Sequence, residues 1–75
     1  MDIRLTDRGF EIVEFTDLLN QKCTLQQSSI ALFEQPGSGA IWLGADKDRM
    51  HLRYETVLEL LPLLQRWAEN GSFFP

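Results

Sequence analysis

The chain has 75 residues, of which 44% are hydrophobic and 24% are charged, with seven Lys and Arg against eleven Asp and Glu. This length permits one small domain, and the formal net charge of -4 argues against general binding to duplex nucleic acid or anionic lipid. A single cysteine excludes an intramolecular disulfide, and one cysteine with one histidine cannot complete a structural zinc site, so we expect no metal or other cofactor. Because so short a chain has a small core, we expect a homo-oligomer, in which self-association buries more surface.

The sequence carries no pattern typical of a targeting or membrane segment. Residues 1–10 contain four charged side chains, so they lack the apolar stretch of a signal peptide. The longest apolar run, residues 60–64, is far shorter than the roughly 20 residues that a membrane span needs. We therefore expect a cytoplasmic protein that does not bind membranes and in which Cys23 stays a free thiol.

The first half of the chain predicts an antiparallel hairpin. Residues 10–16 and 22–27 alternate apolar and polar side chains, which is the period of a β-strand. Joining them through residues 17–21 gives a register that pairs apolar residues with each other: Phe15 with Cys23, and Val13 with Leu25. A short edge strand over residues 3–5 is expected before the hairpin, followed by a turn at residues 7–9.

The middle of the chain predicts a loop and a second hairpin. Residues 30–34 are a further candidate strand, and residues 35–39, with two glycines and a proline, predict a loop. Residues 40–44 and 49–52 then predict two strands joined by a turn at residues 45–48.

This second hairpin predicts a candidate binding surface. With a four-residue turn, Trp42 faces His51, and the alternation leaves one face apolar for a helix to cover. The other face would carry an indole, two arginines and the only histidine: Trp42, Arg49, His51 and Arg53. Guanidinium groups offer forked donors for phosphate or carboxylate, and an indole offers a flat surface for a base. The surface therefore predicts a site for a small anionic, nucleotide-like ligand.

Two other interpretations of this face stay open. Arginine stems could simply cover Trp42 on a solvated face, held by weak cation–π contacts. Alternatively, Trp42 could lie at the centre of an interface with a second copy or a foreign protein, because Trp and Arg are frequent hot-spot residues. A site built across a self-interface would combine the ligand and interface interpretations.

From Tyr54 the apolar spacing becomes helical and continues to residue 70. Gly71 is suited to the left-handed position after a helix, and Pro62 either kinks the helix or breaks it in two. The predicted buried stripe is Val57, Leu60, Leu61, Leu64, Trp67 and Ala68. The expected fold is thus a single α+β domain over residues 1–75: a small antiparallel sheet of about four to five strands within residues 1–53, and one C-terminal helix, residues 54–70, packed on one face.

Four apolar residues outside the helix are candidate interface residues. Two leucines at the tip of the first hairpin would be exposed in a monomer, and this favours a contact with a partner or with another part of the chain. Two phenylalanines after the helix can fold back on it or be exposed. These residues are Leu18, Leu19, Phe73 and Phe74.

No catalytic constellation can be assembled, so we do not expect an enzyme. Ser28 and Ser29 end a strand without a Gly-x-Ser-x-Gly motif, and hydroxyls there commonly bond the local backbone. Cys23 faces Phe15 on the apolar side of the hairpin, which indicates a core thiol. The glycines of residues 36–39 lack the Gly-Lys-Ser/Thr ending of a phosphate-binding loop.

Most of the chain, from about residue 10 to 71, resembles a family of small proteins of tailed phages and prophages. The matching segments are residues 14–17, 23–29, 41–44 (Ile-Trp-Leu-Gly), 49–52 (Arg-Met-His-Leu) and 60–66 (Leu-Leu-Pro-Leu-Leu-Gln-Arg). The chain departs from the family at Arg53, where a helix-capping Ser or Thr is usual, and at Thr56, where Gln is usual. The resemblance implies a common origin and fold rather than a chemistry.

Small acidic accessory proteins of phages commonly interfere with a host component, and by analogy we expect the same of this protein. We expect a non-enzymatic counter-defence protein in the host cytoplasm that sequesters a nucleotide-like ligand on the Trp42 face. The alternative is an inhibitor that binds and blocks a host defence protein.

Overall fold

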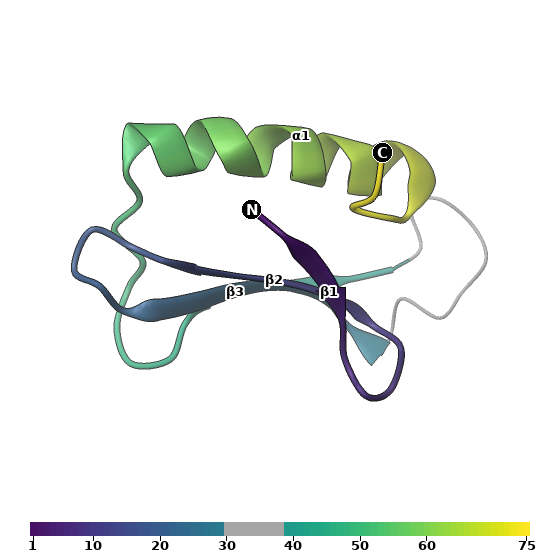
Figure 1. Cartoon of the computed structure of the whole chain (residues 1–75), viewed down its shortest axis with the longest axis horizontal. Helices are drawn as coiled ribbons and strands as arrows, with labels where there is room; N and C mark the ends of the chain where they lie inside the picture. Colours follow the sequence, from purple (N-terminus) through teal and green to yellow (C-terminus); the bar gives the residue numbers. More distant parts are fainter. Residues whose placement is uncertain (30–38) are drawn as a thin grey trace.

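The computed structural model describes residues 1–29 and 39–75 of the chain. These residues form a four-stranded antiparallel sheet with strand order β1-β2-β3-β4 and one helix that lies over one of its faces (Figure 1). The elements are β1 (Ile3–Leu5), β2 (Glu11–Thr16), β3 (Lys22–Gln27), β4 (Ile41–Ala45) and α1 (Tyr54–Asn70). The α+β architecture is the one predicted, whereas the candidate strand at residues 30–34 lies outside the described residues.

The first hairpin has the predicted register. β2 and β3 pair with Phe15 opposite Cys23 and Val13 opposite Leu25. Val13, Cys23 and Leu25 are all fully buried, because the alternation turns them toward α1. β1 is the predicted edge strand, with Ile3 opposite Val13.

The second predicted hairpin is wrong. β4 pairs with β3, with Gln26 opposite Trp42, and residues 49–53 form no strand. Main-chain groups that would enter a ladder are held by the β2–β3 turn instead: the Leu18 N–H donates to the His51 carbonyl at 2.8 Å, and the His51 N–H donates to Asp17 Oδ2 at 3.1 Å. The segment between β4 and α1 is therefore bonded to the β2–β3 turn.

The core lies between the sheet and α1, and the predicted stripe of the helix is only partly right: Leu60, Leu64 and Trp67 contact the core, whereas Val57, Leu61 and Ala68 are exposed. The buried residues of α1 are Thr56, Leu60 and Leu63. Leucines occur on two adjacent stripes of this helix, so the spacing alone cannot decide which one packs. Leu60 and Leu63 contact a core completed by the strands and the C-terminal segment: Val13, Leu25 and Phe73.

The helix is continuous through Pro62, so of the two predicted alternatives, a kink or a break, the break does not occur. Pro62 lies on the exposed side, where its missing N–H and ring disturb only the outer helix surface. The helix ends as predicted at Gly71, whose φ of 76° is left-handed and whose N–H donates to the Trp67 carbonyl at 2.8 Å.

The segment after α1 folds back into the core. The Phe73 N–H donates to Glu11 Oε1 at 2.6 Å, the Ser72 hydroxyl donates to Glu11 Oε2 at 2.8 Å, and Arg66 Nε donates to the Phe73 carbonyl at 2.8 Å. Phe73 is 0% exposed, so its assignment to an exposed interface is wrong, whereas Phe74 remains 44% exposed.

Candidate functional site

The structure separates the four residues of the predicted binding surface. Trp42 lies on the sheet face opposite α1, in a row with Gln26 and Ile12, and its side chain is 66% exposed. Arg49 and His51 belong to the segment after β4 and line a different pocket, and Arg53 precedes the first residue of α1. The separation arises because residues 49–53 form no strand on the other edge of β4; the β2–β3 turn holds the main-chain groups of His51 instead.

Trp42 lines an open pocket of about 460 Å³ together with the turn between β1 and β2. That turn extends on the side of the sheet away from α1 (Figure 1). It contributes Arg8 and Phe10 to the pocket, and β3 contributes Gln26. The Arg8 guanidinium carbon lies 5.6 Å from the centre of the Phe10 ring, within cation–π range. The pocket therefore combines two aromatic surfaces with one cation, and Asp7 adds a carboxylate to its lining.

Hydrogen bonds within the β1–β2 turn fix the position of this part of the pocket. The Thr6 N–H donates to the Phe10 carbonyl at 2.7 Å, and the Phe10 N–H donates to the Thr6 hydroxyl at 3.0 Å. Gly9 completes the turn with a φ of 87°, a backbone conformation that favours glycine, and donates to the Thr6 carbonyl at 2.8 Å. Arg8 and Phe10 therefore project from a rigid support.

Several polar groups of this pocket are free to bind a ligand. Within residues 1–29 and 39–75, the Gln26 amide and the Trp42 indole N–H have no hydrogen-bond partner, and Arg8 forms no ion pair. Gln27, by contrast, is engaged: its Oε1 accepts the Glu11 N–H at 2.8 Å, and its Nε2 donates to the Gly71 carbonyl at 3.1 Å. The free groups are the donors and acceptors that a small polar ligand would use.

Sequence reasoning missed Arg8 and Phe10 as site residues. The turn at residues 7–9 is evident in the sequence, but its place beside Trp42 depends on the strand order. In an antiparallel sheet, the start of β2, the end of β3 and the start of β4 lie at one end, as the pairings of Ile12 with Gln26 and Gln26 with Trp42 show. The β3–β4 pairing is thus the information that would have located the site.

Arg49 and His51 line a second pocket, of about 350 Å³, together with Leu19 and Met50. It lies where the β2–β3 turn meets the segment after β4, at the end of the molecule where α1 begins (Figure 1). Leu19 is 62% exposed, which agrees with its predicted exposure at the hairpin tip. This pocket brings two of the predicted ligand residues beside a predicted interface residue.

Asp17 holds this end of the molecule together, and sequence reasoning assigned it no role. Its carboxylate is fully buried and accepts four hydrogen bonds, from the N–H groups of Leu19, Gln21 and His51 and from Gln21 Nε2, at 2.8–3.1 Å. Burial raises the pKa of this carboxyl, but the hydrogen bonds from His51, Gln21 and Leu19 outweigh it, so the pKa lies below its ordinary value. Asp17 is therefore a structural anion.

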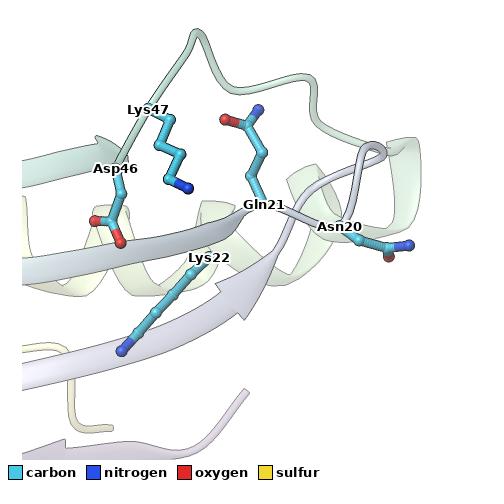
Figure 2. Close-up of a pocket in the computed structure, with 5 residues that line it drawn as sticks. All are labelled: Asn20, Gln21, Lys22, Asp46 and Lys47. Carbon is cyan, nitrogen blue, oxygen red and sulfur yellow. The ribbon is translucent and has the colours of Figure 1, made fainter.

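A third pocket, of about 420 Å³, is lined by polar residues but poorly suited to an anion (Figure 2). Its lining includes Lys22, Lys47 and Asp46. Lys22 points away from the other two side chains (Figure 2), and its ammonium group lies 3.1 Å from Glu14 Oε2. Glu14, which also pairs with Arg4, therefore engages Lys22, and the remaining cation of the pocket, Lys47, shares its lining with the carboxylate of Asp46.

The predicted assignment of Cys23 to the core is confirmed. The thiol is fully buried, its sulfur lies 3.6 Å from the Gln21 carbonyl, and burial raises its pKa above the ordinary value.

Among the described residues, no group of three or more His, Cys, Asp and Glu side chains could hold a metal ion. No helix in the same part of the chain is both long and apolar enough to cross a membrane.

Comparison of the chain with protein-family models, curated proteins and solved structures found no match. The resemblance to small phage proteins therefore remains a prediction.

Proposed function

We propose that this protein binds a small anionic, nucleotide-like ligand in the Trp42 pocket. The observation that carries the proposal is the combination of a largely exposed Trp42 with the Arg8–Phe10 pair in one pocket of about 460 Å³. This volume lies within the roughly 300–1,000 Å³ common for small-molecule sites. In this proposal Arg8 binds the anionic group of the ligand, the role predicted from the sequence for Arg49, His51 and Arg53.

The pocket offers complementary groups for the two parts of a nucleotide. A base would stack on Trp42, an interaction typically worth about 1–3 kcal/mol per base. The free Gln26 amide would donate to and accept from the edge of that base, and Arg8 would bind a phosphate oxygen pair through its forked donors. Asp7 favours hydroxyl or amino groups of the ligand nearby, so a ligand with one or two phosphates fits better than a polyphosphate.

Binding without chemical conversion would remove such a ligand from solution. In a phage accessory protein of the kind that the sequence resembles, this would interrupt a host defence signal made of a nucleotide. The proposed biological role is therefore sequestration in the host cytoplasm.

Calorimetric titration with mononucleotides and cyclic di- and oligonucleotides tests the proposal. We expect one compound class to bind, Trp42→Ala and Arg8→Ala each to weaken binding at least tenfold, and neither variant to change the melting temperature appreciably. Arg49→Ala is the matched control, because Arg49 is an exposed arginine outside the pocket, and it should bind like the wild type. No binding across the panel, or binding that Trp42→Ala leaves intact, would contradict the proposal.

A second candidate function is the inhibition of a host protein by direct contact. The favouring observation is the exposed Leu19 beside Arg49, Met50 and His51 in the second pocket, since leucine, methionine and arginine together suit a protein interface. A host protein captured by the wild type and lost with Leu19→Ser, but retained with Trp42→Ala, would favour this function over ligand binding.

A further inference from the structure

The two edges of the sheet differ in how they are protected. β1 is a three-residue strand whose central residue, Arg4, is charged and pairs with Glu14. β4 has five residues, Ile-Trp-Leu-Gly-Ala, with neither a charge nor a proline. Short strands, charges and prolines are the usual means of preventing edge-to-edge association. β1 carries two of these features and β4 carries none.

The register identifies the main-chain groups that β4 presents outward. The Ser28 N–H donates to the Ala40 carbonyl at 3.0 Å, which makes this a hydrogen-bonded pair. Hydrogen-bonded pairs alternate along an antiparallel ladder, so Trp42 and Gly44 direct their N–H and C=O groups toward β3. The alternate residues of the strand, Ile41, Leu43 and Ala45, direct these groups away from β3, and in the described part of the chain the groups have no partner.

We propose that two copies of this chain associate through β4, antiparallel and with the two-fold axis at Leu43. In this register Leu43 pairs with Leu43 of the second copy, and Ile41 pairs with its Ala45. Each of these is a hydrogen-bonded pair, so every outward N–H and C=O of the strand finds a partner. A two-fold axis needs only a surface that is complementary to itself, and this strand meets that condition.

The side chains fit this arrangement on both faces. Trp42 comes opposite Gly44 of the second copy in a non-hydrogen-bonded pair, the type in which side chains approach most closely. A Cβ added at Gly44 would meet nothing within 4 Å, so the space above this glycine is open to the indole. On the other face, Leu43, which is 38% exposed, would pack against its own copy.

Charge does not oppose the association. Each chain carries a net charge of -4, but β4 itself is uncharged. In the proposed register Asp46 comes opposite Ala40, and Lys47 opposite Gly39, so no like charges meet across the axis. The association depends on the strand edge alone and can be measured without any ligand.

Sedimentation velocity of the purified protein, with variants at the axis, tests the proposal. The wild type should have twice the 8.7 kDa mass of one chain. Leu43→Lys and Leu43→Glu should each be monomeric, because like charges then meet at the axis. Mixing the two variants should restore the double mass, because residue 43 of one copy lies opposite residue 43 of the other and opposite charges then meet. Leu5→Lys, on the β1 edge and 61% exposed, is the matched control and should remain a dimer.

Amide hydrogen exchange gives a second test, which uses only the wild type and so does not depend on whether a variant folds. In a monomer, the N–H groups of Trp42 and Gly44 are protected, and those of Ile41, Leu43 and Ala45 exchange rapidly. In the proposed dimer all five are protected. The proposal would be overturned by a monomeric wild type, by the alternating exchange pattern, or by charged variants that both remain dimers. It would also be overturned if both variants stay folded but their mixture does not regain the double mass.

Discussion

The carboxylate of Asp17 accepts the backbone N–H of His51 at 3.1 Å, although the two residues are 34 positions apart in the chain. The Leu18 N–H donates to the carbonyl of the same residue, His51, at 2.8 Å. One turn residue and its neighbour therefore satisfy both main-chain groups of His51. This explains why the segment after β4 forms no strand.

Replacing Asp17 with Asn should destabilise the protein. An amide offers one acceptor oxygen in place of two and directs an NH₂ group toward backbone donors that Asp17 now satisfies. We expect the melting temperature, measured by circular dichroism, to fall by roughly 5–10 °C. Asp46→Asn is the control, because Asp46 is exposed, and it should melt like the wild type. Equal melting of the Asp17 variant would show that the buried carboxylate is dispensable.

The same carboxylate should make stability depend on pH in the acid range. The pKa of Asp17 is lower in the folded protein than its ordinary value, so the unfolded chain binds a proton more readily. Its contribution is therefore complete above a pH of about 4 and is lost as the pH falls through the folded-state pKa. Urea unfolding between neutral pH and about pH 2 should show this loss. The loss should be smaller in Asp17→Asn, and an identical pH profile in both proteins would contradict the assignment.

Phe73→Ala and Phe74→Ala should have very different effects on stability. Phe73 is fully buried among Val13, Leu25, Leu60 and Leu63, so its truncation leaves a cavity and should cost about 3–5 kcal/mol. That is a large part of the stability expected for a domain of this size, and the variant is expected to be partly unfolded. Phe74 is half-exposed, and its truncation should cost less than about 1 kcal/mol. Denaturant titration measures both, and similar losses would place Phe73 outside the core.

Gly71 should be the most sensitive position at the end of α1. Its φ of 76° is unfavourable for a residue with a Cβ, so Gly71→Ala should cost about 1 kcal/mol in the free energy of unfolding. Asn tolerates this conformation better, and Gly71→Asn should lose less. If both variants unfold at the same denaturant concentration as the wild type, the left-handed cap contributes nothing.

The parts of the fold that were predictable rest on local patterns. The pairing of Phe15 with Cys23 follows from two adjacent strands whose alternation permits one register only, since a slip by one residue would turn apolar side chains to solvent. The helix end at Gly71 follows from one residue type with one backbone preference. Both signals lie within a short stretch of sequence.

The errors arose where a distant residue decides the outcome. Residues 49–52 alternate as a strand does, but Asp17 and Leu18 take the main-chain groups of His51. The helix has two stripes of leucine, and the strands and Phe73 decide that Leu60 and Leu63 are the buried ones. The partners of Trp42 are set by strand order, so Arg8 and Phe10 could not be found from spacing along the chain.

The return of Phe73 to the sheet also orders the events of synthesis. Phe73 follows the strands and the helix of the described residues, yet its N–H bonds to Glu11, 62 positions earlier, and its ring completes the core. A nascent chain that has exposed only the sheet therefore has Val13 and Leu25 without their final covering. The native core can therefore be completed only after residue 73 has left the ribosome, and until then the place of its ring beside Val13, Leu25, Leu60 and Leu63 is unfilled.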